Sequence, residues 1–275
     1  MSNLKEWFDR NFRGIEPGED VQLAKAMRNP SPDVGVPIGD FNEMIGIYAP
    51  RGYGKSSKAL DIAEELQEAG PAYVIAHDPG FRLPPNRPDG SPRPIVRHKT
   101  RQSVLTALQT HPTGIQAWGG QFEREDGTRE TITSEQVIEL ATEVAARSKV
   151  AAGQAHGLED VTSPDDFRLA GLPAIPVVVL IDEAVMARGA SKNRMSPEMR
   201  DFLISLRHLH VGLVYTAQGG GMVHYDMVQL ATELYLGKSI HTRAHKAFED
   251  AGVPADVIAK LPTMERFQFE RVLIG

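Results

Sequence analysis

The chain has 275 residues, of which 41% are hydrophobic and 24% charged, as is typical of a soluble protein with a substantial core. This length predicts one large α/β domain with small appendages, and the formal net charge of −6 means that any contact with DNA or RNA has to be local. The absence of cysteine excludes disulfides and cysteine-ligated zinc, and no apolar run approaches the roughly 20 residues needed for stable membrane insertion.

The N-terminal part of the chain differs from the rest. Residues 3–12 and 19–28 predict two short amphipathic helices, and residues 29–40 form a linker rich in proline and glycine. We therefore expect a helical arm and linker over residues 1–40, and one α/β domain over residues 41–275.

From residue 44 onwards, short apolar segments alternate with helical patterns, which indicates a mostly parallel sheet built from βαβ units and flanked by helices. The predicted strands are 44–48, 72–77, 94–98, 114–118, 176–181, 211–216, 233–236 and 267–273. The predicted helices are 55–69, 101–110, 134–150, 196–208, 225–232, 243–251 and 254–260.

A glycine-rich turn joins the first strand to the first helix of this domain. In such a turn, backbone N–H groups and the positive end of the following helix can bind phosphate oxygens. The Gly-Lys-Ser order provides Lys55 for the β- and γ-phosphates and Ser56 for Mg²⁺. Ala49 replaces the usual first glycine, and it fits if the backbone there has a negative φ. The predicted nucleotide-binding residues are Ala49, Pro50, Arg51, Gly52, Tyr53, Gly54, Lys55, Ser56 and Ser57.

A proline-rich segment over residues 81–101 carries a local excess of positive charge. Its basic residues are Arg82, Arg87, Arg93, Arg97, Lys99 and Arg101, against the single acid Asp89. Such a segment can contact DNA phosphates without reading sequence, or it can be a solvated loop without a partner. Residues 189–195 are a second candidate loop, and residues 118–130 are a third that has the mixed charge of a surface β-hairpin.

Acidic side chains follow the apolar strand over residues 176–181. Asp182 and Glu183 stand at the exit of this strand, where paired carboxylates are costly unless they are used. In phosphate-loop enzymes the first acid supports Mg²⁺ and the second acts on the attacking water. The next strand, 211–216, is followed by Gln218, and a parallel strand beside Asp182 would place Thr216 or Gln218 near the γ-phosphate.

Three sequence stretches together resemble the FtsK–HerA superfamily of DNA-pumping ATPases: APRGYGKSS, VVVLIDEA and RHLHVGLVYTAQ. The stretch VIAHDPG, which includes Asp78 and Pro79, resembles the Asp-Pro step of the same superfamily. In its small size, the chain resembles the genome-packaging ATPases of membrane-containing icosahedral viruses within this superfamily. The resemblance covers residues 42–275.

This resemblance implies a RecA-like phosphate-loop fold and a homo-oligomeric ring, such as a hexamer, with ATP and Mg²⁺ at subunit interfaces and double-stranded DNA in the pore. It implies that Lys55 and Ser56 bind phosphate and Mg²⁺, that Asp182 supports Mg²⁺, that Glu183 is the general base and that Gln218 is the sensor. An arginine from the neighbouring subunit would complete the site. Arg207 is the first candidate, with Arg188, Arg194 and Arg243 as alternatives.

The function predicted from the residues and the resemblance is an ATP-driven ring motor that packages a viral genome into a preformed capsid. Capsid or portal-vertex proteins would be further partners, and the expected location is the cytoplasm of the host or the virion. One alternative is a cellular or plasmid DNA translocase, or a phage ATPase for virion extrusion. A small-molecule kinase is a second alternative, although it needs neither Asp182-Glu183 nor the Thr216-x-Gln218 strand.

Overall fold

The computed structural model describes residues 43–69, 72–110, 113–123, 129–155, 176–182, 203–204, 206, 211–218 and 225–274. The predicted N-terminal arm and most of the predicted helix 196–208 lie outside these ranges.

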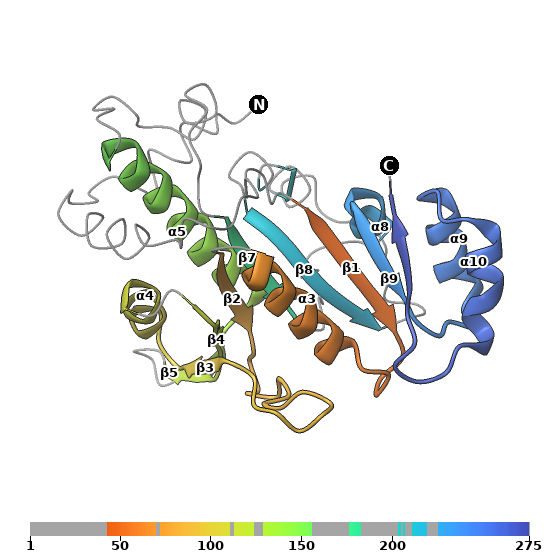
Figure 1. Ribbon diagram of the computed structural model, residues 1–275, viewed down its shortest axis with the longest axis horizontal. Coiled ribbons are helices and arrows are strands. Elements are labelled where there is room, and N and C mark those ends of the chain that lie inside the picture. Colours follow the sequence, from red (N-terminus) through yellow and green to blue (C-terminus); the bar gives the residue numbers. More distant parts are fainter. Residues whose placement is uncertain are drawn as a thin grey trace.

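An eight-stranded sheet forms the centre of the described part, in the order β10-β9-β1-β8-β7-β2-β4-β3 (Figure 1). All its neighbouring strands run parallel except β10, which pairs antiparallel with β9. The strands are β1 (Met44–Ala49), β2 (Tyr73–His77), β3 (Ile95–His98), β4 (Ile115–Trp118), β7 (Val177–Ile181), β8 (Val211–Gln218), β9 (Glu233–Leu236) and β10 (Glu270–Leu273). A separate antiparallel pair joins β5 (Gln121–Glu123) to β6 (Arg129–Thr131), which confirms the predicted hairpin.

Helices cover both faces of the sheet. They are α3 (Lys55–Ala69), α4 (Arg101–Thr110), α5 (Ser134–Ala155), α8 (Tyr225–Leu230), α9 (Thr242–Asp250) and α10 (Ala255–Lys260), followed by the short 3-10 helix η1 (Leu261–Thr263). On one face, α3 packs against alternate strand residues such as Ile47, Val178 and Leu180. On the other face, α4, α5, α8 and α9 pack against the intervening residues, such as Val177 and Val179. The uninterrupted apolar sequence of β7 follows from this, because both of its faces are buried.

The predicted α/β class with a mostly parallel sheet is confirmed. One difference concerns the last strand, which begins at Glu270 and not at residue 267. The reason is that Phe267 has a φ of 66°, a left-handed conformation that no strand residue adopts. Strand β8 continues to Gln218, two residues beyond the prediction, and α5 continues to Ala155.

Parallel pairing determines where the site lies. Strands β1, β8 and β7 are adjacent, so their carboxyl ends lie at one edge of the sheet, next to the start of α3 (Figure 1). Ligands of open α/β sheets bind at this edge.

Candidate phosphate-binding site

The loop between β1 and α3 has the backbone freedom that phosphate binding requires. Gly52 and Gly54 have φ values of 79° and 87°, which side-chain-bearing residues rarely adopt. The N–H of Lys58 donates to the carbonyl oxygen of Gly54 at 2.9 Å, so helical hydrogen bonding starts directly after the turn. The first N–H groups of a helix have no partner within the helix itself, so the start of α3 is a place where an anion can bind.

Ala49 is the last residue of β1 and is completely buried. It is not among the described non-glycine residues with positive φ, which satisfies the condition for alanine at this position. Gly237, which follows β9, also helps to accommodate alanine at position 49, because a Cβ on Gly237 would lie 2.8 Å from the Cβ of Ala49. The missing side chain at Gly237 thus leaves room for the methyl group that replaces the usual glycine.

Lys55, the first residue of α3, is 6% exposed. Its Nζ donates a hydrogen bond to the carbonyl oxygen of Pro50 at 3.1 Å, across the loop. The ammonium group is thereby kept at the glycine-rich turn and out of bulk water. A buried cation beside the N-terminus of a helix is well suited to bind a phosphate group.

Ser56, Asp182 and Thr216 meet at the carboxyl edge of the sheet. Ser56 Oγ lies 2.9 Å from both carboxylate oxygens of Asp182, and Thr216 Oγ1 donates to Asp182 Oδ1 at 2.8 Å. These residues come from α3, from the exit of β7 and from β8. The three oxygen-bearing side chains fit a magnesium site, because Mg²⁺ prefers hard oxygen ligands such as carboxylates and hydroxyls.

Gln218 ends β8 beside the phosphate loop. In the parallel register, Gln218 is the partner of Ala49, and Thr216 is the partner of Ile47. In the β7–β8 register Ile181 is the partner of Tyr215, so Asp182 and Thr216 are the next residues along and their side chains meet. Gln218 lies two residues after Thr216 on the same strand, beside the phosphate loop. The expectation that this strand runs parallel beside the Asp182 strand is confirmed by the β7–β8 pairing.

Several predicted residues lie outside the described part of the chain. They are Glu183, Arg188, Arg194 and Arg207, together with the candidate loop 189–195. Arg243 is described and is an exposed residue of α9. The described residues contain no group of three or more histidines, acids or cysteines that could hold a metal ion.

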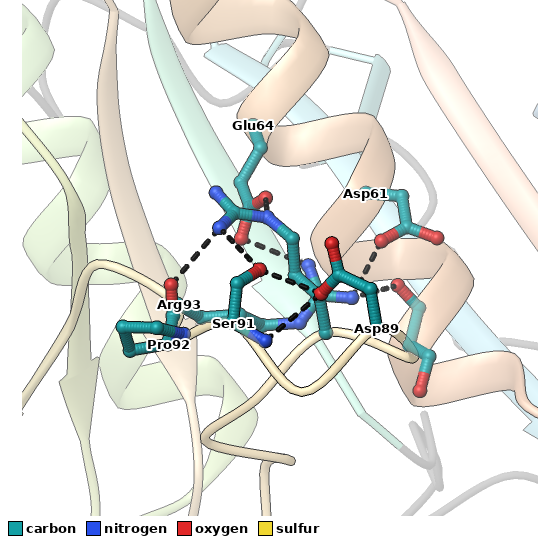
Figure 2. Close-up of polar contacts among 8 residues, drawn as sticks. Asp61, Glu64, Asp89, Ser91, Pro92 and Arg93 are labelled. Carbon is teal, nitrogen blue, oxygen red and sulfur yellow. Dashed lines mark hydrogen bonds and ion pairs between the residues drawn. The ribbon is translucent and has the colours of Figure 1, made fainter.

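The segment between β2 and β3 is attached to the helix of the phosphate loop. Arg93 projects between Asp61 and Glu64 of α3, as Figure 2 shows. Its Nη2 lies 2.5 Å from Asp61 Oδ1 and its Nη1 lies 2.8 Å from Glu64 Oε1, while its side chain has no exposed area. Burial disfavours the charged form of Arg93, but the hydrogen bonds to both carboxylates outweigh it and raise the pKa of this guanidinium.

These contacts correct the interpretation of the basic segment 81–101. Arg93 is buried and cannot contact DNA, and Arg87 pairs with Glu64 at 2.8 Å. Arg97 lies 3.7 Å from Asp78, and Arg101 pairs with Glu143. The local charge count missed these partners because the acids come from elements outside the segment. Arg82 and Lys99 are exposed and belong to none of these ion pairs, whereas Arg97 and Arg101 are exposed but paired.

Asp78 is the first residue of the segment that joins β2 to β3, and it has a structural role that the sequence did not reveal. Its carboxylate is buried and accepts hydrogen bonds from the backbone N–H groups of Arg82 at 2.6 Å and Leu83 at 3.3 Å. Asp78-Pro79-Gly80 is a turn sequence, and side-chain bonding by Asp to nearby backbone N–H groups is the usual reason for Asp in such turns. The Asp-Pro step therefore shapes the entry to the segment.

The comparisons with known proteins concern the fold. No family model matches the sequence, and no curated protein sequence matches it. Among solved structures, the DNA-packaging ATPase B204 of Sulfolobus turreted icosahedral virus has 13% identity over 86% of this chain and 94% of its own, with a TM-score of 0.52. The chain is similar in fold to a viral genome-packaging NTPase.

Two nucleotide complexes of the protein of the same name from a second virus are similar in fold to this chain as well. The genome-packaging NTPase B204 of Sulfolobus turreted icosahedral virus 2 in complex with AMPPCP has 11% identity over 85% of this chain and 93% of its own, with a TM-score of 0.52. Its complex with ATPγS has 14% identity over the same shares, with a TM-score of 0.51. These structures support the expected phosphate-loop fold and show nucleotide analogues bound to proteins of this fold.

Proposed function

We propose that this chain is an ATPase that acts as a ring motor on double-stranded DNA and packages a viral genome into a preformed capsid. The observation that carries the proposal is the meeting of Ser56, Asp182 and Thr216 beside the glycine-rich loop that holds Lys55. The fold similarity to the packaging NTPase B204 supports the choice of packaging among the tasks of such ATPases.

Within this proposal, the loop over residues 49–57 binds the triphosphate through backbone N–H groups and Lys55. Mg²⁺, held by Ser56 and Asp182, would neutralise charge on the phosphates. Thr216 donates to the carboxylate of Asp182 and so fixes its orientation. Lys55 is kept at the loop by its bond to Pro50, so it has little conformational freedom to lose when phosphate binds.

Hydrolysis and its control are assigned to three further residues. Glu183 follows Asp182 in sequence and would accept a proton from the attacking water. Gln218 ends β8 next to the loop, where its neutral amide would orient water or contact the γ-phosphate. Arg207 of a neighbouring subunit would stabilise the charge on the transferring phosphoryl group, which makes the ring necessary for activity.

DNA contact is assigned to those exposed cations of the segment 81–101 that do not take part in its ion pairs with Asp61, Glu64, Asp78 and Glu143. Arg82 and Lys99 are exposed, and contacts of such side chains with phosphates are independent of sequence. The segment is fixed to α3 through Arg93, so these cations belong to a surface that is connected to the phosphate-loop helix. The loop 189–195 is a second candidate for DNA contact.

The test is the steady-state ATPase rate with and without long double-stranded DNA, at low and at moderate salt. We expect hydrolysis in the absence of DNA, stimulation by DNA, and loss of that stimulation as salt rises. Lys55→Ala should abolish hydrolysis, with Lys246→Ala as a matched control, since Lys246 is an exposed cation of α9 that pairs with Asp250.

The outcomes separate the parts of the proposal. Hydrolysis that persists in Lys55→Ala would refute the phosphate site. A rate that is the same with and without DNA would refute the DNA motor and leave the ATPase standing. The double variant Arg82→Ala, Lys99→Ala should reduce stimulation and lower the salt slope by up to about 2; an unchanged slope would move the DNA contact elsewhere.

A further inference from the structure

The segment between η1 and β10 lies against the phosphate loop, although the two are far apart in sequence. Arg266 donates from Nε and Nη2 to the carbonyl oxygen of Gly52, at 3.2 and 2.9 Å, across 214 positions of the chain. The ring of the next residue, Phe267, lies against Gly54: a Cβ at Gly54 would stand 2.5 Å from Cδ1 of that ring. The aromatic side chain is therefore in direct contact with the turn that would hold the phosphates.

Phe267 has two properties that packing does not explain. Its ring is exposed, with 69% of the residue accessible, although an aromatic side chain would gain from burial. Its φ of 66° is in the left-handed region, which is unfavourable for a bulky residue. Non-glycine residues in such conformations persist where the surroundings hold them, and they concentrate at ligand sites. Here the two bonds from Arg266 to Gly52 supply that support.

The guanidinium of Arg266 also orders the neighbouring rings. Its central carbon lies 5.8 Å from the centroid of the Phe267 ring and 5.9 Å from that of the Tyr53 ring. These are distances at which a cation is attracted to an aromatic ring. Phe267 is thus held in place at the loop while most of its surface stays open to solvent.

We propose that Phe267 is the surface on which the base of the bound nucleotide stacks, and that Arg266 is the residue that positions it. The inference rests on the proposed function, because it needs the triphosphate to occupy the loop over residues 49–57. A base is connected to those phosphates through its ribose, so it must lie near the loop. An exposed, rigidly held aromatic ring in contact with the loop offers the flat apolar surface that bases bind, and such stacking tolerates any base.

The test compares two probes by calorimetry on the full chain in the presence of Mg²⁺: ATP, and inorganic tripolyphosphate, which has no base. Loss of base stacking costs about 5- to 150-fold in affinity. We expect Phe267→Ala to raise the Kd for ATP by that factor and to leave the Kd for tripolyphosphate within about twofold. Phe267→Trp should bind ATP like the unchanged protein.

Two further variants separate stacking from stability. Phe267→Gly suits the left-handed backbone, so it should melt at the same temperature as the unchanged protein or higher, yet bind ATP as weakly as Phe267→Ala. Ile240→Ala is the matched control, because Ile240 is also 69% exposed and lies outside this contact. It should leave both Kd values unchanged.

Each result has a distinct meaning. An equal change in the Kd values of both probes would show that the ring only shapes the loop, and would overturn the inference. An unchanged ATP affinity in both Phe267→Ala and Phe267→Gly would also overturn it. Failure of the unchanged protein to bind either probe would refute the proposed phosphate site itself, and the stacking proposal with it.

Discussion

Replacing Arg93 by methionine tests whether the buried ion cluster holds the segment between β2 and β3 on α3. Methionine keeps much of the side-chain volume and removes the positive charge. The change would leave Asp61 and Glu64 close together without the guanidinium that lies between them (Figure 2). Both carboxylates would then have to regain water, or repel each other, in a place shaped around a cation.

The cost follows from the exposure of the two acids. Removing one partner of a fully buried ion pair costs about 3–5 kcal/mol. The Asp61 side chain is 36% exposed and can be rehydrated, and Glu64 keeps its bond to Arg87 at 2.8 Å. We therefore expect Arg93→Met to lower the free energy of unfolding by about 2–3 kcal/mol, which is less than most fully buried pairs would lose. For a chain of this size the melting temperature should fall by about 5–10 °C.

The assay is thermal unfolding followed by circular dichroism, with Arg82→Met as the matched control. Arg82 belongs to the same segment and is exposed, so its replacement should shift the melting temperature by less than about 2 °C. A double-mutant cycle with Glu64→Gln should give a coupling energy of about 1 kcal/mol or more. If Arg93→Met melted within about 2 °C of the unchanged protein, the cluster would not be what fixes this segment.

Three other predictions concern the sheet and the site. Gly46→Ala should lower stability by about 1–3 kcal/mol in urea unfolding, because its Cβ would lie 2.5 Å from the Tyr215 hydroxyl, which bonds to Tyr48 and to the Met227 carbonyl; an unchanged midpoint would contradict this close packing. Burial lowers the pKa of His77 below 6.5, against smaller opposite effects of its bond to Ile132 and of nearby acids. As pH falls below 6.5, the unfolded chain takes up a proton at His77 that the folded chain does not, so the free energy of unfolding decreases. His77→Gln should therefore lose less stability than the unchanged protein between about pH 7.5 and 5.5. Equal losses in the two proteins would show that His77 is not the group responsible. Glu183→Gln should bind ATP but hydrolyse it at least about 100-fold more slowly, and an unchanged single-turnover rate would remove Glu183 as the base.

Features that depend on local sequence could be predicted well. The bounds of the helix Arg101–Thr110 and the strand Glu233–Leu236 agree with the pattern of apolar residues. The glycine-rich loop is recognisable because Gly52, Gly54, Lys55 and Ser56 lie within five positions, between a strand pattern and a helix pattern. The contact of Thr216 with Asp182 follows from the parallel pairing of β7 with β8, which agrees with the expectation that a parallel strand beside Asp182 brings Thr216 to the site.

Features that depend on distant partners could not be predicted. The bond from Arg266 to Gly52 joins residues 214 positions apart, and nothing near Arg266 indicates it. The alternating pattern places Phe267 in the last strand, although its φ is 66°, because such a pattern records side-chain character and not φ. Only the fold reveals that the loop after η1 reaches the phosphate loop.

The basic segment 81–101 shows the same limit for electrostatics. Six cations against one acid within the segment suggested a surface for DNA phosphates. The fold places Arg93 between two acids of α3, and Arg87 beside one of them. A fully buried guanidinium has already exchanged its water for carboxylates, so it contributes little to the field that a DNA molecule would meet. The positive charge available for DNA is therefore set by which cations remain exposed, Arg82 and Lys99 among them, and not by the number of basic residues in the segment.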